Sequence, residues 1–203
     1  MKHFAVIGNP VEHSLSPALH NWVFKLLNIQ AEYKKIMVEK KEVPNIIQQI
    51  NNSTLDGFNV TIPHKENIMQ FLDVINPRAE IIGSVNCVMK SNSSIIGNNT
   101  DWFGFTMALK INEIDLSGRE VIVLGAGGTA KSILFSLKQL GAIKIILLNR
   151  TLQKARALQD EVISSYSLEK TKSVIKNDSI IINTTPIGMQ SNESPIELEL
   201  LHN

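Results

Sequence analysis

The sequence predicts an α/β protein, with an N-terminal α/β lobe followed by a Rossmann-like lobe. Three observations support this fold class. Short apolar runs alternate with helical patterns, a glycine-rich turn stands between an apolar strand and a helix, and the pattern changes near residue 100. The chain of 203 residues is long enough for two small domains. We expect these domains at residues 1–100 and 101–203.

The first lobe begins with a strand and a helix. Phe4–Ile7 is an apolar run closed by Gly8-Asn9-Pro10, a combination typical of a buried strand and a turn. Ser16 before Pro17 fits an N-cap with proline at the first helical position, so a helix is expected up to residue 27. The patterns that follow predict strands over 33–38 and 58–62, helices over 42–50, 64–72 and 77–82, and a hairpin of 85–89 with 94–96.

The second lobe repeats strand and helix more regularly. After a helix over 102–111, Val121–Leu124 is a fully apolar strand, and a helix up to Leu140 follows the glycine turn. Gly141 stands where a left-handed C-terminal cap is expected. Ile145–Leu148 is the next buried strand and completes a β-α-β unit. A helix over 152–163 and a strand over 179–182 extend the lobe.

The composition of the chain argues against several kinds of binding partner and against a metal site. A formal net charge of +1 gives no overall field that favours nucleic acid or an anionic membrane. No apolar stretch reaches the roughly 18 residues of a membrane helix, and the first residues lack the pattern of a signal peptide. The single cysteine, Cys87, excludes an internal disulfide, and the five histidines have no metal-ligand spacing. We therefore expect a cytoplasmic protein without a metal.

The glycine turn predicts a nucleotide site. Gly125, Gly127 and Ala130 fit the pattern G-x-G-x-x-A between the apolar strand and the helix. The first glycine permits a tight turn, the second lets the backbone approach a pyrophosphate, and the alanine lets helix and strand pack closely. The helix N-terminus adds N–H donors and partial positive charge. The alternative is an ordinary structural turn.

The residues after the next strand indicate which dinucleotide is bound. NAD-binding folds usually place an acidic residue there for the ribose 2′-hydroxyl. This sequence has Asn149-Arg150-Thr151 instead, so no carboxylate repels a phosphate and the guanidinium offers a fork of donors. NADP is favoured over NAD, although Arg150 could also be an ordinary solvated arginine.

Two residues of the first lobe and its boundary are candidate catalysts. Lys65 is expected in the first turn of a helix at the carboxyl end of a strand, where ligands bind in open α/β sheets. By position alone Lys65 could equally be a solvated surface lysine. Asp101 follows Thr100 before a helix and could be a simple helix cap.

Seven motifs in order resemble the shikimate dehydrogenase family along essentially the whole chain. They are Ser14-Leu15-Ser16-Pro17, Asn59-Val60-Thr61-Ile62-Pro63-His64-Lys65-Glu66, Ser84-Val85-Asn86, Asn99-Thr100-Asp101, Gly125-Ala126-Gly127-Gly128, Asn149-Arg150-Thr151 and Asn183-Thr184-Thr185-Pro186-Ile187-Gly188-Met189. The resemblance implies a substrate lobe and an NADP lobe, and reversible NADPH-dependent reduction of 3-dehydroshikimate to shikimate in the biosynthesis of aromatic amino acids.

The resemblance also assigns roles to single residues. Lys65 and Asp101 would form the catalytic pair, and Met189 would lie near the nicotinamide. The substrate carboxylate would be bound by Ser14 and Ser16, and the ring hydroxyls by Asn59, Thr61, Asn86 and Asp101. The pyrophosphate would contact Gly125, Ala126, Gly127 and Gly128, and the 2′-phosphoadenosine would contact Asn149, Arg150 and Thr151. The partners implied are small molecules, and the chain would be a monomer or a homodimer.

The chain departs from the family pattern after Met189. The family normally adds another Rossmann strand and closing helices that return to the substrate lobe, and the second lobe is therefore expected to be incomplete. Two further interpretations stay open: a quinate/shikimate dehydrogenase with relaxed cofactor use, and a truncated protein that binds NADPH or a shikimate-like ligand without turnover. A different NADP enzyme sharing the Gly125–Arg150 unit is a third, against which the first 100 residues argue.

Overall fold

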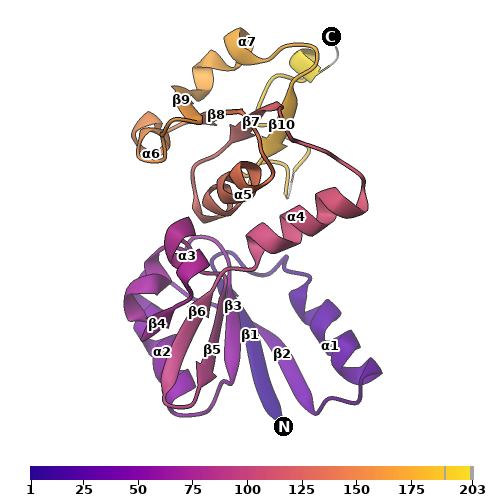
Figure 1. The fold of residues 1–203 in the computed structure, drawn as a ribbon. Helices are drawn as coiled ribbons and strands as arrows, with labels where there is room; N and C mark the ends of the chain where they lie inside the picture. The colour runs from indigo at the N-terminus through magenta and orange to yellow at the C-terminus, as the bar shows by residue number, and fades with distance from the viewer. Residues whose placement is uncertain (190, 202–203) are drawn as a thin grey trace. The chain divides into compact units, whose positions relative to one another are not determined.

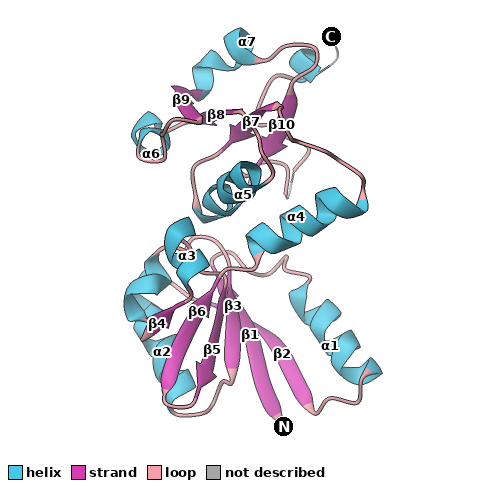
Figure 2. Cartoon of the chain, in the orientation of Figure 1, coloured by secondary structure: helices cyan, strands magenta, loops and turns pink. Residues whose placement is uncertain are grey.

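The computed structural model of the chain describes residues 1–189 and 191–201. It divides into two compact α/β units, residues 1–100 and residues 101–203. Each unit has its own sheet and its own helices, as the colouring by chain position and by secondary structure makes clear (Figures 1 and 2). The predicted α/β class is confirmed.

The first unit is built on a mixed six-stranded sheet of order β2-β1-β3-β5-β6-β4. Strand β1 pairs in parallel with β2 and β3, whereas β5 is antiparallel to both β3 and β6. The strands are β1 (Lys2–Gly8), β2 (Ala31–Met37), β3 (Gly57–Val60), β4 (Val74–Ile75), β5 (Cys87–Ser91) and β6 (Ser94–Asn98). Its helices are α1 (Ser16–Leu26), α2 (Val43–Asn51) and α3 (Pro77–Ile82), with 3₁₀ turns η1 (Lys40–Glu42) and η2 (Asn67–Phe71).

Side chains of the sheet alternate between two apolar clusters. Ala5 and Ile7 belong to a large buried cluster with residues of α2 and α3, whereas Val6 packs with Tyr33 and with Phe24 of α1. This alternation is the period of two that a strand imposes on its side chains. Both faces of the sheet are therefore covered at β1.

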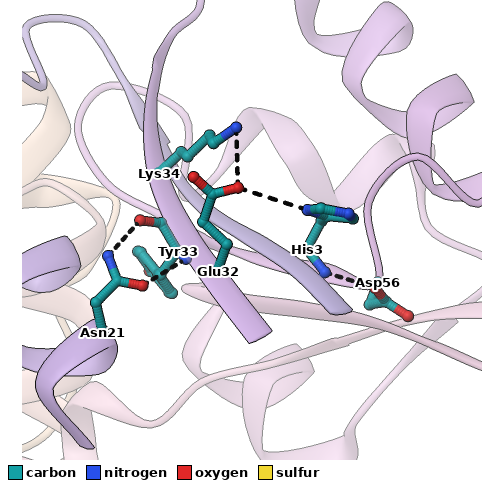
Figure 3. Close-up of polar contacts among 6 residues, drawn as sticks. All are labelled: His3, Asn21, Glu32, Tyr33, Lys34 and Asp56. Atoms are coloured by element: carbon teal, nitrogen blue, oxygen red, sulfur yellow. Dashed lines mark hydrogen bonds and ion pairs between the residues drawn. The ribbon is translucent and has the colours of Figure 1, made fainter. Parts of the chain in front are cut away.

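Helix α1 is also fastened to the edge strand by polar contacts. The side chain of Asn21 donates to the Tyr33 carbonyl at 2.9 Å and accepts from the Tyr33 N–H at 2.8 Å (Figure 3). At the start of β1, the His3 N–H donates to the Asp56 carboxylate at 2.8 Å (Figure 3). The amide of Asn21 pairs with the backbone of an edge strand as a neighbouring strand would, which fixes the position of Tyr33.

One predicted helix of this unit is wrong. Residues 62–66 form turns, and only the short 3₁₀ segment η2 follows, in place of a helix over 64–72. The Lys65 carbonyl accepts from the N–H of Val85 at 2.7 Å, a residue outside the local segment, while the Met69 N–H reaches the Glu66 carbonyl. A tertiary hydrogen bond has thus replaced the helical one at Lys65. The predicted hairpin is present. Its two strands pair as far as Ser91 opposite Ser94, so its turn consists of only Asn92 and Ser93, with Asn92 in the left-handed region.

The second unit is a parallel sheet of order β10-β7-β8-β9 with helices on both faces. The strands are β7 (Glu120–Leu124), β8 (Lys144–Asn149), β9 (Ile163–Ser167) and β10 (Ile180–Asn183). The helices are α4 (Asp101–Ile111), α5 (Gly128–Gln139), α6 (Leu152–Arg156) and α7 (Thr171–Val174), with 3₁₀ turns η3 (Leu168–Lys170) and η4 (Leu198–Leu201). Val121 and Val123 face a cluster with α5, and Ile122 and Leu124 face a cluster with Leu168. Burial on both faces explains the unbroken apolar runs of these strands.

The predicted helix over 152–163 is half wrong. Helix α6 ends at Arg156, and Ile163 begins strand β9, a strand that the sequence pattern does not predict. The Asp160 carboxylate accepts the N–H groups of Val162 and Ile163, both at 2.9 Å, and this local turn directs the chain into the sheet. Burial of Ile163 beside β8 then outweighs its helical spacing. Within the described residues, no helix is long and apolar enough to span a membrane.

Candidate active site and nucleotide site

The polar residues of the first unit gather where β1 and β3 end. The Thr61 N–H donates to the Ile7 carbonyl and the Asn9 N–H to the Ile62 carbonyl, both at 2.9 Å, so the segments after the two strands run together. Gly8 permits this approach, because a Cβ at this position would lie 2.4 Å from the Thr61 methyl carbon. The carboxyl edge of the sheet is the expected place for a ligand.

Ser14 and Ser16 lie in the turn that leads into α1. The Ser14 hydroxyl oxygen accepts from the Ser16 N–H at 3.3 Å. The predicted N-cap role of Ser16 is wrong: the helix begins at Ser16, its N-cap residue is Leu15, and no side chain caps it. The Ser14 contact is a local turn before the helix, and Ser16 lies in the first helical turn. Burial raises the pKa of the Tyr33 hydroxyl, and a side-chain hydrogen bond with Ser16 opposes that shift.

Asn59 and Asn86 are connected to each other and to Tyr33. The Tyr33 hydroxyl donates to Asn59 Oδ1 at 2.6 Å, and Asn59 Nδ2 donates to the Asn86 carbonyl at 3.2 Å. The Asn86 side chain continues to Thr100, with Nδ2 donating to the threonine hydroxyl at 3.0 Å and Oδ1 accepting the Thr100 N–H at 2.8 Å. We call this set the polar cluster: Ser16, Tyr33, Asn59, Asn86 and Thr100.

Tyr33 and Thr100 were not among the predicted site residues. Burial, strengthened by the nearby Cys87 and opposed by the Ser16 contact, raises the pKa of the Tyr33 hydroxyl far above its ordinary value. The phenol therefore stays protonated and acts as a donor to Asn59. A tyrosine in a strand is unremarkable in sequence, so nothing local distinguishes Tyr33 from a core residue.

The structure places the two candidate catalysts in different units. Lys65 is half-buried in the turns after β3, and its backbone is held by Val85, the residue before Asn86. Asp101 is the first residue of α4 and follows Thr100 directly in the chain. Both residues are thus attached through their backbones to segments that carry members of the polar cluster.

The glycine turn of the second unit has the geometry of a phosphate loop. Gly125 has a φ of +105°, and a Cβ there would lie 2.7 Å from the Thr184 hydroxyl oxygen, so only glycine fits. At Gly127 a Cβ would meet nothing within 4 Å, which leaves open space beside the backbone for a ligand. Ala126 is buried, Gly128 begins α5, and Ala130 is fully buried where helix and strand pack. The residues present fit the pyrophosphate of a dinucleotide.

A cavity of about 190 Å³ joins three of the sequence motifs of this unit. Gly125 of the glycine turn, Asn149 and Arg150 after β8, and Thr185 after β10 all line it. Asn149 Nδ2 donates to the Thr151 carbonyl at 2.8 Å, which shapes the turn into α6. Arg150 is exposed and also borders a second, larger hollow of about 520 Å³. None of the described residues that line the smaller cavity has a carboxylate, and this favours the binding of a 2′-phosphate by Arg150.

Three other expectations have different outcomes. Met189 is 72% exposed and is not among the residues that line this cavity, and its role near a nicotinamide stays a prediction. Within the part of the chain that the structure describes, no group of three or more His, Cys, Asp or Glu side chains could hold a metal ion. Cys87 is half-buried in β5, and burial raises the pKa of its thiol, which disfavours the reactive thiolate.

These features define a two-unit α/β protein of the dinucleotide-binding class, with a polar site in the first unit and a phosphate loop in the second. The profile of the shikimate dehydrogenase substrate-binding domain matches residues 6–88, and that of shikimate/quinate 5-dehydrogenase matches residues 106–191. A shikimate dehydrogenase (NADP(+)) of Bacillus cereus is 41% identical over 97% of this chain and 73% of its own length. The chain belongs to the shikimate dehydrogenase family.

Solved structures agree with this assignment. Shikimate dehydrogenase 1 of Peptoclostridium difficile superimposes with a TM-score of 0.90 at 33% identity, over all of this chain and 74% of that protein. The Thermus thermophilus enzyme, crystallised with NADP(H) and shikimate, superimposes with a TM-score of 0.84 at 35% identity, over 98% of this chain and 75% of that protein. The predicted family and two-lobe fold class are confirmed.

Proposed function

We propose that the chain catalyses the reversible, NADP-dependent reduction of 3-dehydroshikimate to shikimate, a step in the biosynthesis of aromatic amino acids. One observation carries the proposal: hydroxyl and amide side chains from five separate segments meet in the polar cluster, beside the backbone that holds Lys65. Neutral donors and acceptors of this kind suit a polyhydroxylated ring. Family membership supplies the substrate class.

The second unit would hold the cofactor. Gly125, Ala126, Gly127 and Gly128 would bind the pyrophosphate, since the open space at Gly127 and the start of α5 suit a diphosphate. Asn149, Arg150 and Thr151 would bind the 2′-phosphate and its ribose, because a guanidinium on the wall of the cavity can form paired charge-assisted hydrogen bonds. Met189 would lie near the nicotinamide. When bound, NADPH supplies the hydride.

The first unit would hold the substrate. Ser14, in the turn before α1, and Ser16, the first residue of α1, would donate to its carboxylate. Asn59, Thr61, Asn86 and Asp101 would bind the ring hydroxyls. The fixed bonds among Asn59, Asn86 and Thr100 would keep the amide groups oriented before the substrate arrives, which lowers the entropy lost on binding.

Lys65 and Asp101 would form the catalytic pair. Reduction of a ketone builds negative charge on its oxygen, and the Lys65 ammonium would stabilise this charge and deliver the proton. The Asp101 carboxylate would favour the protonated form of Lys65. In the reverse direction Lys65 would accept the proton of the shikimate hydroxyl.

The decisive experiment follows reduction of NADP by the nicotinamide absorbance, with shikimate as substrate and the chain in its present length. Turnover with shikimate and NADP, and much slower turnover with NAD or quinate, is the expected result. Comparable rates with NAD or quinate would favour the relaxed quinate/shikimate dehydrogenase instead. Binding of NADPH and shikimate without turnover would contradict the proposed activity and favour a non-catalytic binding protein.

We also place the protein in the cytoplasm, as a monomer or a homodimer. Membership of the shikimate dehydrogenase family is the support for this part of the proposal. Size-exclusion chromatography with light scattering would give the oligomeric state, and a larger assembly would contradict it.

A further inference from the structure

A buried hydrogen-bonded pair lies directly behind the polar cluster. The side chain of Asn99 donates through Nδ2 to both the carbonyl and the hydroxyl oxygen of Ser84, each at 2.9 Å. Asn99 is 2% exposed and Ser84 is fully buried. We call these two residues the buried pair.

The buried pair stands where the backbone ladder of a hairpin stops. Strands β5 and β6 pair up to Cys87 opposite Asn98, and one more backbone bond joins the Asn86 N–H to the Asn98 carbonyl at 3.0 Å. Beyond this point side chains connect the two segments: Asn86 with Thr100, and Ser84 with Asn99. Four side chains therefore connect residues 84–86 directly with residues 99–100.

Because the pair is buried, water cannot replace a hydrogen bond that is lost between its two members. A donor or acceptor that loses its partner in a buried site cannot recover the hydrogen bond from water, so its full desolvation cost appears. Loss of the Asn99 amide would remove a donor from two Ser84 acceptors at once. The Ser84 carbonyl and hydroxyl would each lose that hydrogen bond, which weakens the connection between the two segments.

We propose that Asn99 and Ser84 are positioning residues, which hold Asn86 and the Thr100–Asp101 segment at the separation that the substrate requires. This inference rests on the proposed function, because Asn86 and Asp101 are the residues whose placement would matter. Both members of the buried pair belong to the first unit, whereas the residues proposed to bind the cofactor belong to the second unit. The pair should therefore affect shikimate and leave NADP untouched.

The test compares three variants of the full chain. Asn99→Ala removes the donor, and we expect the KM for shikimate to rise about tenfold, the effect of one lost buried hydrogen bond. Ser84→Ala removes only the hydroxyl acceptor and leaves the carbonyl, so a rise of about threefold is expected. Ser136→Ala is the matched control, because this buried serine donates to the Trp102 carbonyl within the second unit.

The pattern of constants separates positioning from simple destabilisation. A purely structural loss would lower the active fraction, and with it the apparent kcat, without changing the KM of the remaining folded molecules. Positioning predicts a higher KM for shikimate with the KM for NADP within about twofold of wild type, less than one lost hydrogen bond would cause. Unchanged KM values in both Asn99→Ala and Ser84→Ala would overturn the proposal.

A readout without ligand keeps this inference separate from the proposed function. The Thr100 N–H donates to Asn86 Oδ1, and its hydrogen exchange reports whether the two segments keep their separation. We expect faster exchange at Thr100 in Asn99→Ala, to a smaller extent in Ser84→Ala, and no change in Ser136→Ala. If wild type neither binds nor turns over shikimate, the proposed function fails. Unchanged exchange at Thr100 in both variants would instead refute the positioning role.

Discussion

The two units build their sites in opposite ways. In the second unit the glycine turn is one continuous segment, Gly125–Gly128, whose backbone conformation is the feature proposed to bind the pyrophosphate. In the first unit the polar cluster consists of side chains separated by up to 84 residues, from Ser16 to Thr100, and held by side-chain hydrogen bonds. A substitution in a site made of backbone impairs binding through conformational strain. A substitution in a site made of side chains impairs binding because hydrogen-bond partners are lost. Substitutions should therefore have different signatures in the two units.

The largest effect is expected at Lys65. Lys65→Ala should lower kcat for shikimate by about 100-fold or more, the contribution typical of a general acid or base. The Kd for NADPH should stay unchanged, since the residue lies in the first unit. Steady-state rates and a fluorescence titration with NADPH measure the two quantities.

Lys41→Met is the matched control for this change, because Lys41 is an exposed lysine of the same unit that pairs with Glu39. Its kcat should equal that of wild type. If Lys65→Ala retained full turnover, Lys65 would have no place in the mechanism, and the first unit would lose its proposed catalyst.

Arg150 tests whether the second unit distinguishes the two dinucleotides. Arg150→Asp should weaken NADPH by about 10-fold to 100-fold, because a charge-assisted contact contributes about 1.5–3 kcal/mol and a carboxylate adds repulsion. NADH, without the 2′-phosphate, should be weakened far less. Arg156→Asp, an exposed arginine at the end of α6, provides the control. Equal losses for both nucleotides would refute the contact with the 2′-phosphate.

Gly125→Ala tests the backbone site directly. A left-handed φ costs a residue with a side chain about 1–2 kcal/mol, and the new Cβ would clash with Thr184. We expect lower free energy of unfolding for the second unit and at least tenfold weaker NADPH binding, about 1.4 kcal/mol. Gly104→Ala, in α4 with nothing near its Cβ, should leave both quantities unchanged or slightly raise stability. Equal behaviour of the two variants would contradict the strain argument.

The smallest effect concerns Asp160 at the turn into β9. Burial raises the pKa of the Asp160 carboxyl. Hydrogen bonds from Lys138 and from the N–H groups of Ile163 and Val162 lower this pKa by more than burial raises it, so it lies below the ordinary value of aspartate. A depressed pKa stabilises the fold above the ordinary range of aspartate, and this contribution is lost as the pH falls through the folded pKa. Because the side chain is 39% exposed, solvent screening limits it to less than about 1 kcal/mol.

Chemical unfolding of wild type and Asp160→Asn at several pH values would measure this contribution. We expect Asp160→Asn to be slightly less stable at neutral pH and equal to wild type in acid, once the pH has fallen below the depressed pKa of Asp160 in the folded protein. The same substitution at exposed Asp178 should change nothing at either pH. If the stability difference between wild type and Asp160→Asn persisted in acid, the geometry of the Asp160 side chain rather than its charge would stabilise this turn.

Much of the second unit was determined by the sequence alone. The apolar runs of β7 and β8, the glycine turn and the left-handed Gly141 are local signals, and the structure reproduces each of them. The order of the seven motifs likewise predicts the family from the sequence. These features depend on neighbours in the chain, where side-chain period and backbone freedom are readable.

Tertiary structure decided what depends on distant partners. The bond from Val85 to the Lys65 carbonyl replaced a predicted helix, and burial beside β8 turned a helical pattern at Ile163 into a strand. The buried Asn99–Ser84 pair and the donor role of Tyr33 arise only when segments far apart in the chain are brought together. A sequence pattern records the preferences of each residue, but the partner of a buried polar group is chosen by the fold, because only there does leaving it unpaired become costly.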